Sequence, residues 1–425
     1  MEIKKLHFHF IKGGTEMKGK WLTVAVPILL CIVLVIGWTK PATTQPKPFK
    51  IGYIGGLTGF LAIYNVPALA GIKYAVEEIN NEGGLLGRPV ELIVRDGKDR
   101  PDVSLSEARD LVHKEGVTTL LAGTSTAMVL AVSAFAKEQK VLLLPAPTAG
   151  HVCGKEGHRY IFKPANYNSD MSGFAMGEYL AAKPWKKYYL IGSDYVAGHE
   201  VISYLWKRLT EKKPIVEKVG ELWPKMIERD FTSYITAIMQ ANPEAVIAML
   251  PGTAGIDFIR QAKGFGFFKK IEYVSVLLST ADLVALGKET PEGIIGGCEY
   301  AFPYCGEKYP IAKRIQERYD RDYKDHNYTT MAVGYGTMLF LKEAVRKAGS
   351  LDTEKIIDAM EGLTVETAVG RIKCLEYSHQ GAVPVFLGVT AFSPKYPFAI
   401  LKDIKVYQGE KIMISEDEIR KMRGE

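Results

Sequence analysis

The 425-residue sequence has few residues that hold metal ions, with five cysteines and eight histidines. No two cysteines have the spacing CxxC and the histidines form no cluster, so we expect neither a metal nor another cofactor. The motifs HExxH and GxSxG are absent, and the glycines of "GYIGGLTG" have the spacing GxxGGxxG, which differs from the dinucleotide fingerprint GxGxxG. These absences argue against an enzyme.

The excess of positive over negative charge is confined to the N-terminal segment. The formal net charge is +6, and residues 1–50 hold eight lysines and two acidic residues, so residues 51–425 are close to neutral. A neutral body lacks the basic face that binds nucleic acid, and we expect no nucleic-acid partner. With 47% hydrophobic residues the chain can bury a large core, and its length predicts two domains.

A long apolar run is present once, from Trp21 to Trp38, after Lys18 and Lys20. This pattern is typical of a signal peptide or an N-terminal membrane anchor, and the lack of a clear small-x-small cleavage site favours the anchor. A buried core helix is the remaining interpretation. The Pro/Thr-rich segment "TKPATTQPKP" that follows predicts an extended tether. We therefore expect the body of the protein outside the cytoplasm.

Oxidising surroundings permit disulfides among four cysteines of the body, Cys153, Cys298, Cys305 and Cys374. Four cysteines allow three full pairings, and the sequence does not choose among them. Unpaired buried thiols are the other interpretation.

Short apolar runs alternate with helix-period segments from Phe49 onward, which predicts parallel α/β sheets. Strands are expected at residues 50–55, 90–96, 118–123, 141–146, 187–193, 215–222, 245–250 and 272–278. Helices are expected at 67–81, 104–115, 127–139, 169–183, 198–212, 231–241, 255–266, 313–324 and 331–349. The stretch "INNEGGLLGR" marks a glycine-rich end of the first helix before the second strand. The alternation falls into two sets, about 50–167 and 168–303, so we expect two α/β lobes.

Several segments, in order, resemble the branched-chain amino acid type of solute-binding protein, the extracytoplasmic receptors of ABC importers. They are "IGYIGGLTGFLAIYNVPALAGIKYAVEEINNEGGLLGRPVELIVRDGKDRP", "DYVAGHE", "RDFTSYITAIMQANPEAVI" and "EGIIGGCEYAFP". The similarity spans roughly residues 48–400. It implies a type I periplasmic-binding fold, in which two Rossmann-like lobes joined by three crossovers close like a Venus flytrap around a small solute.

The same resemblance implies the domain limits. The crossovers are expected near Asn166, Pro303 and Val385. Residues 1–47 would be the signal or anchor segment and linker. Lobe 1 would comprise residues 48–167 plus 304–385, and lobe 2 residues 168–303 plus 386–425.

Loops after strands are the expected binding elements, because helix N-termini there direct N–H groups at a ligand. By the resemblance, "AGTSTAM" would hold a ligand carboxylate through Ser125 and Thr126, and "PAPTAG" would contribute a backbone group at Ala146 and the hydroxyl of Thr148. Each hydroxyl could instead cap its own helix. The resemblance also places Tyr64 as an aromatic wall, with packing into the lobe surface as the other interpretation.

Departures from the family pattern concern the rest of the pocket. Tyr195 lies close to a family pocket tyrosine, but the matching position is Ala197, which would enlarge the pocket or move its aromatic wall. The two acids that clamp the ligand's ammonium in the family correspond here to Asn168 and Leu277. Enclosing an ammonium without an acid costs several kcal/mol. We therefore expect an amine-free acid or an amide in preference to a zwitterion, with a branched-chain amino acid still open if Asp170 substitutes.

The stretch "YSHQGAVPV" places His379 and Gln380 just before the third crossover, where we favour a structural role. The expected partners are a small solute and the permease subunits of an importer, with the protein itself a monomer. A ligand-sensing receptor with the same clamp is the alternative function, and an enzyme a remote one.

Overall fold

The structure is a computed structural model that describes residues 46–59, 61–148 and 152–425. Lys47–Glu425 form one compact unit. The apolar run Trp21–Trp38 lies outside the described residues. Among the described helices, none has the length and apolar character needed to cross a membrane.

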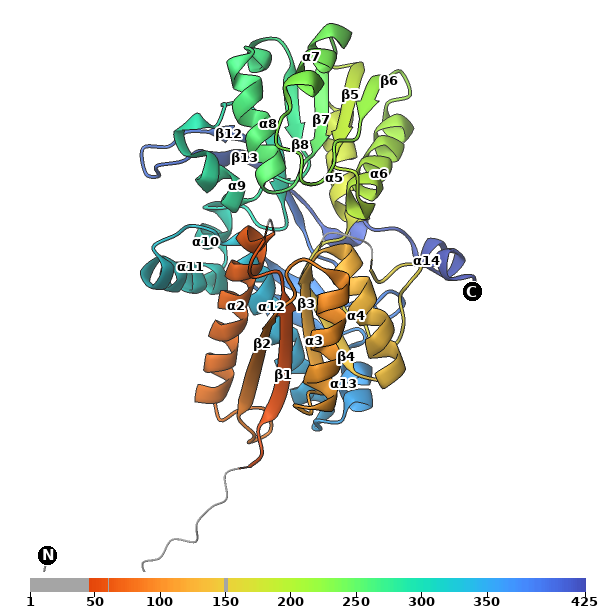
Figure 1. Cartoon of the computed structure of the whole chain (residues 1–425), viewed down its shortest axis with the longest axis vertical. Helices are drawn as coiled ribbons and strands as arrows, with labels where there is room; N and C mark the ends of the chain where they lie inside the picture. Colours follow the sequence, from red (N-terminus) through yellow and green to blue (C-terminus); the bar gives the residue numbers. More distant parts are fainter. Residues whose placement is uncertain (1–45, 60, 149–151) are drawn as a thin grey trace, which may run out of the picture. The chain divides into compact units, whose positions relative to one another are not determined.

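The first sheet has four parallel strands in the order β2-β1-β3-β4 (Figure 1). Its elements alternate along the chain as β1 (Phe49–Gly55), α2 (Ala62–Asn81), β2 (Val90–Asp96), α3 (Pro101–His113), β3 (Thr119–Thr124), α4 (Thr126–Gln139) and β4 (Leu142–Thr148). Helix α2 ends at Asn81, and Gly83 and Gly84 follow with φ values of +100° and +81°. Glycine takes this conformation without strain, so the predicted glycine-rich helix end leads into β2.

The second sheet has seven strands in the order β13-β12-β9-β8-β7-β5-β6. Its parallel part comprises β5 (Lys187–Gly192), β6 (Glu217–Leu222), β7 (Ala245–Met249), β8 (Glu272–Ser275) and β9 (Ile295–Cys298). Strand β12 (Val385–Ala391) pairs antiparallel with β9 and with β13 (Ile400–Tyr407). The helices of this part are α5 (Ser169–Ala181), α6 (Val196–Lys212), α7 (Thr232–Ala241), α8 (Thr253–Gly264) and α9 (Thr280–Leu286), with the short turns η1 (Phe267–Lys269) and η2 (Gly287–Glu289).

The remaining elements follow the second set of strands. They are α10 (Tyr304–Lys308), α11 (Pro310–Tyr323), α12 (Thr329–Ala348), α13 (Thr353–Met360), the hairpin β10 (Thr364–Thr367) and β11 (Gly370–Lys373), η3 (Gly409–Lys411) and α14 (Glu416–Arg423). Helix α12 packs along α2 at two glycines. A Cβ on Gly71 would lie 2.0 Å from Met331 O, and one on Gly334 would lie 2.1 Å from Ala68 O. Only glycine allows the two backbones to approach this closely.

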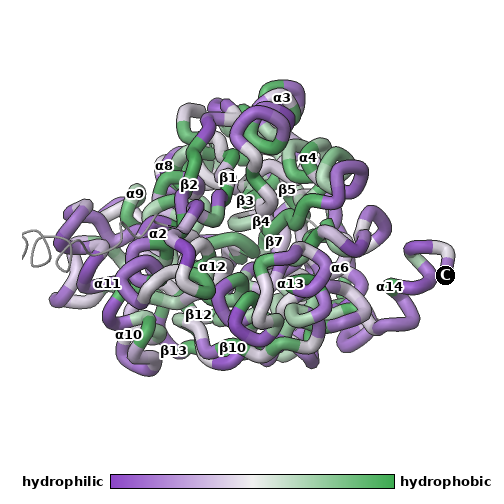
Figure 2. The backbone as a smooth tube through the Cα atoms, turned by 90° about the horizontal axis from the view of Figure 1, so that it is seen from below, coloured by the Kyte–Doolittle hydropathy of each residue, from purple (hydrophilic) through white to green (hydrophobic). Residues whose placement is uncertain are grey.

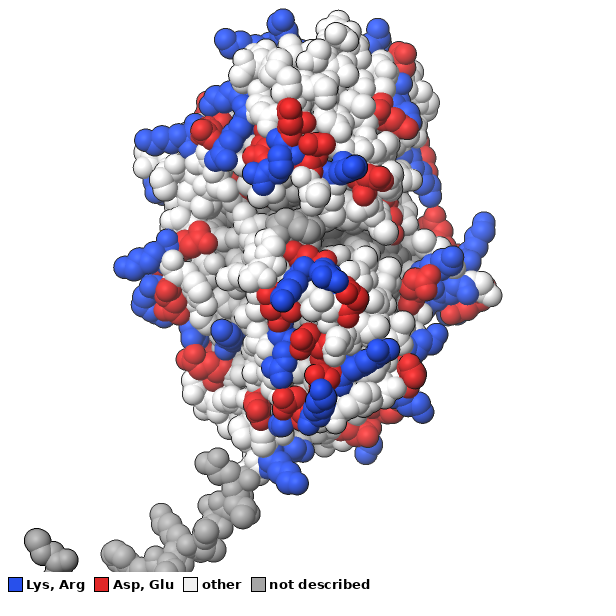
Figure 3. Space-filling model, viewed as in Figure 1, with Lys and Arg blue, Asp and Glu red and all other residues white. Residues whose placement is uncertain are grey.

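All eight strands expected from the sequence are present, each within a few residues of its predicted limits. The central strands are almost entirely buried, which explains their continuous apolar runs. Figure 2 shows hydrophobic segments on strands such as β1, β3 and β7 and hydrophilic turns on outer helices such as α11. On the face in Figure 3, basic and acidic side chains are interspersed, so this face has no large patch of one sign. The residue limits of the two lobes stay a prediction.

Candidate functional site

A cavity of about 60 Å³ lies where loops after strands of both sheets meet. Its wall combines residues from three groups of segments. The segments of the first sheet contribute Leu61, Tyr64, Ser125, Thr126 and Thr148. Those of the second sheet contribute Tyr195, Ala197, Met226, Pro251, Leu277 and Ser279, and the segments connecting them contribute Asn166, Tyr167, Glu299, Thr329 and Thr330.

Most of the residues predicted for the site lie together in this wall. Tyr64, Ser125, Thr126, Thr148, Tyr195, Ala197 and Leu277 all line the cavity. Tyr195 and Ala197 flank the start of α6, so the cavity keeps an aromatic side chain from this loop beside the small one. The roles assigned to these residues stay predictions.

The hydroxyl groups on the first-sheet side are not used to cap a helix. Ser125 is the N-cap residue of α4 and Thr126 its first residue, yet the side chain of Ser125 makes no capping hydrogen bond among the described residues. Thr148 ends β4, is buried, and its Oγ1 has no hydrogen-bond partner among the described residues. The uncapped N–H groups of α4 and the hydroxyl of Thr148 are therefore available to an anionic or carbonyl oxygen.

The hydroxyl of Tyr64 connects elements of the two sheets. It accepts a hydrogen bond from Gly252 N at 2.7 Å and donates to Asp282 Oδ1 at 3.2 Å. Asp282 Oδ2 accepts from Ser279 N and Oγ at 2.8 and 2.7 Å, which fixes the carboxylate at the start of α9. Burial raises the pKa of Asp282 to about 6. Tyr64 is thus more than a residue packed on a lobe surface.

Two predicted residues do not line the cavity. Ala146 is buried within β4. Asn168 is the N-cap residue of α5, and its Oδ1 accepts a hydrogen bond from buried Lys163 Nζ at 2.8 Å. Asp170, the suggested substitute acid, is also outside the wall and accepts from Ile414 N at 2.9 Å. These contacts use the polar groups of Asn168 and Asp170 to hold the crossover region, and the role of Asn168 in ligand binding stays a prediction.

Glu299 is a wall residue that the sequence argument missed. It follows β9 directly, is only 5% exposed, and its Oε2 has no hydrogen-bond partner among the described residues. Burial raises its pKa to about 7, against the opposing effect of the Lys163 charge. An acid that the sequence argument did not consider therefore lines the cavity. Its position in the sequence could have revealed it, because Glu299 directly follows the carboxyl end of a parallel strand, as Ser125 does.

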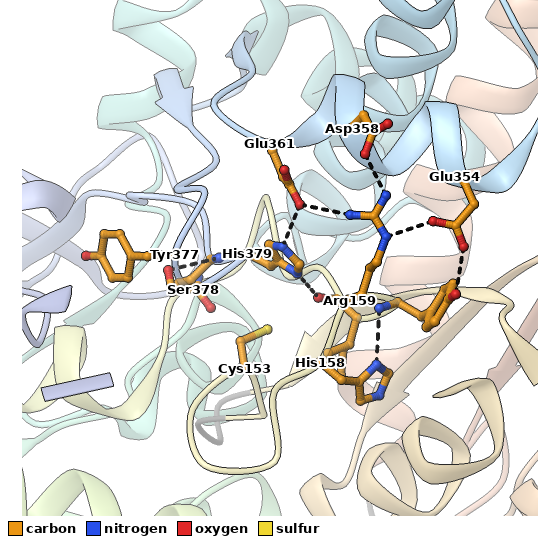
Figure 4. Close-up of polar contacts among 12 residues, drawn as sticks. Cys153, His158, Arg159, Glu354, Asp358, Glu361, Tyr377, Ser378 and His379 are labelled. Carbon is orange, nitrogen blue, oxygen red and sulfur yellow. Dashed lines mark hydrogen bonds and ion pairs between the residues drawn. The ribbon is translucent and has the colours of Figure 1, made fainter. Parts of the chain in front are cut away.

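His379 and Gln380 both make contacts within the protein, and Figure 4 shows those of His379. The His379 ring stacks on Phe162, with 3.8 Å between centroids, and its two nitrogens bond Ile161 O at 3.1 Å and Glu361 Oε1 at 3.2 Å. Gln380 Nε2 donates to Asn166 O at 2.5 Å. Burial lowers the pKa of His379 to about 4, so at pH 7 the neutral ring has one N–H and donates to only one of these two oxygens at a time. These contacts support the structural role favoured from the sequence.

A network of ion pairs continues from this histidine. Arg159 contacts Glu354 at 2.7 Å, Asp358 at 2.6 Å and Glu361 at 3.6 Å, which ties the segment after β4 to α13 (Figure 4). The four cysteines at 153, 298, 305 and 374 are unpaired and buried. Among the described residues, no group of His, Cys, Asp and Glu has the arrangement of a metal site.

Comparison with known proteins connects this geometry to a family. A family model described as periplasmic binding protein matches residues 48–391. The leucine-, isoleucine-, valine-, threonine- and alanine-binding protein of Pseudomonas aeruginosa is 24% identical over 328 residues, covering 76% of this chain and 84% of that protein.

Two solved structures illustrate the fold. A solute-binding protein of an ABC transporter from Rhodopseudomonas palustris BisB5, in complex with 3,4-dihydroxybenzoic acid, has a TM-score of 0.77 at 20% identity and covers 85% of this chain and 98% of that chain. A leucine-binding protein from Thermotoga maritima MSB8 has a TM-score of 0.72 at 21% identity, with coverages of 84% and 98%. The predicted two-lobed α/β fold and the predicted resemblance are confirmed.

Proposed function

We propose that this chain, which belongs to the family of periplasmic binding proteins, is the solute receptor of an ABC importer and encloses one small solute outside the cytoplasm. The observation that carries the proposal is the cavity, whose wall is built by loops of both sheets and contains buried polar atoms without partners. Unsatisfied buried polar atoms are costly, so several in one cavity indicate that a ligand completes them.

The first-sheet side of the cavity would hold a carboxylate or carbonyl oxygen of the solute. The N-terminus of α4 offers uncapped N–H groups beside Ser125 and Thr126, and Thr148 offers a buried hydroxyl. Together they provide the donors and the positive end of a helix dipole that an anion requires. A carboxyl group is common to the leucine and the 3,4-dihydroxybenzoic acid in the names of the relatives.

Binding would shift the protein toward a state in which both sheets contact the solute. The two sides of the cavity are already connected by hydrogen bonds. Tyr64 bonds Gly252 and Asp282, and Thr280 N donates to Thr329 Oγ1 at 3.3 Å. The permease subunits of the importer would recognise the resulting shape, and the chain would act as a monomer without chemical turnover. The N-terminal apolar run would retain it at the membrane surface.

The test uses residues 46–425, which contain the compact unit. Calorimetric titration with small carboxylic acids and amino acids should give one site per chain, and small-angle scattering should give a smaller radius of gyration with a bound solute. The solute should be recovered unchanged after long incubation. Lack of binding by every compound, or an unchanged scattering profile with a bound one, would contradict the proposal.

A further inference from the structure

The C-terminal helix α14 (Glu416–Arg423) follows the part of the chain that matches the family model, which ends at residue 391. None of the residues that form the cavity wall belongs to α14. Figure 1 shows α14 at the side of the molecule, at the level between the two sheets. An influence of this helix on solute binding would therefore act through the elements that it contacts.

The beginning of α14 is attached to α5 and α6, which pack beside the second sheet. Ser415 caps the helix by accepting a hydrogen bond from Glu418 N at 3.2 Å, which fixes its first turn. Just before the cap, Ile414 N donates to Asp170 Oδ2 of α5 at 2.9 Å. Within the first turn, Glu418 pairs with Lys207 of α6 at 3.2 Å. We therefore expect the start of α14 to move with α5 and α6.

The end of α14 is attached to a different part of the chain through Arg423. Its guanidinium donates to the carbonyl oxygens of Cys153 at 2.8 Å and Gly154 at 3.1 Å, in the segment that follows β4. It also donates to Tyr377 O at 3.0 Å, in the segment between β11 and β12. Cys153 is fully buried and belongs to the core cluster formed by residues of β1, β3 and β4, so this attachment reaches the core of the first sheet. Charged donors form stronger hydrogen bonds than neutral ones.

The two attachments join elements that move relative to each other when a clamp of this kind opens. The two sides of the cavity are in contact in this structure, since the Tyr64 hydroxyl bonds Gly252 N and Asp282 Oδ1, so the contacts of α14 belong to a closed form. The guanidinium of Arg423 lies 2.8 to 3.1 Å from its acceptors, and a hydrogen bond is lost beyond about 3.5 Å. Separation of the two sides at this point would therefore break the attachment.

We propose that α14 is a strap that stabilises the closed form of the receptor, with Arg423 as its attachment to the first-sheet side, so that the helix raises the solute affinity from outside the cavity. This inference rests on the proposed function and names a structural control of it. A receptor that encloses its solute gains affinity in proportion to the population of the closed form. An arginine that only secured the C-terminus would raise the stability of the protein and leave the affinity unchanged.

The experiment measures affinity and rates on residues 46–425. Calorimetric titration with a panel of leucine, phenylalanine, 4-methylpentanoate and 3,4-dihydroxybenzoate selects the tightest binder as the probe. Arg423→Met removes all three hydrogen bonds and keeps an unbranched side chain. We expect it to weaken the probe roughly tenfold with one site per chain retained.

Stopped-flow mixing, followed by tryptophan fluorescence, gives the rate constants for the same probe. Because the strap stabilises the closed form, Arg423→Met should raise the dissociation rate roughly tenfold and change the association rate by less than about twofold. A variant that is merely less stable would instead show fewer sites per chain at an unchanged dissociation rate. That result would overturn the inference.

Arg420→Met is the matched control on the same helix. Arg420 pairs with Glu416 at 2.6 Å and Glu425 at 3.5 Å, both within the C-terminal segment, so it attaches α14 to neither sheet. It should leave the affinity and the dissociation rate within about twofold of the wild type. Unchanged or tighter binding in Arg423→Met, or an equal loss in Arg420→Met, would overturn the inference and leave the receptor function intact. Failure of the wild type to bind any of the four compounds would instead contradict the proposed function, on which the inference rests.

Discussion

The Tyr64 hydroxyl should determine how tightly the two sides of the cavity hold together around a solute. Tyr64→Phe removes the hydrogen bond from Gly252 N at 2.7 Å and the one to Asp282 Oδ1 at 3.2 Å, and leaves the aromatic ring in the wall. Both partners are buried, so the loss leaves a backbone donor and a carboxylate acceptor incompletely satisfied. Each unsatisfied buried group costs about 1–2 kcal/mol, or about 2–4 kcal/mol together.

This cost would fall on the solute-bound state, because the two bonds connect α2 with elements of the other sheet. A loss of about 2 kcal/mol corresponds to roughly a 30-fold weaker affinity. The assay is calorimetric titration with the tightest-binding carboxylate of the panel above. We expect scattering of the variant to require more solute before the radius of gyration falls.

Tyr53→Phe is the matched control for this prediction. Tyr53 is also a buried tyrosine, but its hydroxyl contacts Asn65 O at 3.3 Å and Oδ1 at 3.2 Å, both within the first-sheet elements. It should lower the thermal unfolding temperature and change the affinity less than threefold. An affinity of Tyr64→Phe within threefold of the wild type would refute the reasoning. It would mean that the two hydrogen bonds of the Tyr64 hydroxyl stabilise the solute-free and the solute-bound protein equally.

Four further predictions concern the Thr148 hydroxyl, the Glu299 carboxyl, the Arg423 contacts and the N-terminal segment. Thr148→Val should weaken a carboxylate solute about tenfold by calorimetry without lowering the unfolding temperature, because Thr148 Oγ1 has no protein partner among the described residues; an unchanged affinity would remove Thr148 from the site. The pKa of Glu299 is raised by folding from 4.5 to about 7, so its contribution to stability is present below pH 4.5 and lost as the pH rises to about 7. Glu299→Gln should therefore be more stable than the wild type in urea at pH 8 by up to about 3 kcal/mol, and by much less at pH 5; an equal difference at both values would contradict this. Arg423→Met should lower the unfolding temperature, because its guanidinium donates to the carbonyls of Cys153, Gly154 and Tyr377 at 2.8, 3.1 and 3.0 Å, whereas Arg420→Met on the same helix loses only exposed ion pairs and should change little. Full-length protein should stay with membranes through a high-salt wash; recovery of a chain starting near Ala42 or Thr43 would establish a cleaved signal instead.

The sheets were predictable because their strands are local signals. A run such as "VLLLPA" is apolar throughout, and a strand buried on both faces requires this composition whatever its neighbours are. The hairpin of β10 and β11 and the antiparallel strand β13 were not assigned. β10 and β11 pair only with each other, and β13 pairs only with β12 at the edge of the second sheet. Their residues are partly exposed, so none of these strands has the continuous apolar run that marks a buried strand.

The cavity was partly predictable for a related reason. Ser125 and Thr148 lie at strand ends, and parallel strands bring their carboxyl ends to one edge of the sheet. Asn168 lies outside the cavity wall, where its Oδ1 accepts a hydrogen bond from Lys163 Nζ, a contact that no spacing rule predicts. Glu299 was overlooked because only the two positions that hold acids in the family were considered, and these positions are Asn168 and Leu277 in this chain.

The glycine contact between α2 and α12 has a mechanical consequence. At Gly71 and Gly334 the backbones of α2 and α12 approach so closely that the helices cannot slide past each other without a steric clash. We therefore expect α2 and α12 to move as one rigid unit. Tyr64 lies near the start of α2 and Thr329 at the start of α12. Tyr64 forms a hydrogen bond with Asp282 of α9, and Thr329 forms one with Thr280 of α9. A displacement of α9 would therefore act on α2 and α12 together through these two hydrogen bonds. Alanine at position 71 or 334 would push the two helices apart. Movement of α9 would then be coupled less closely to α2 and α12, although no residue of the cavity wall had changed.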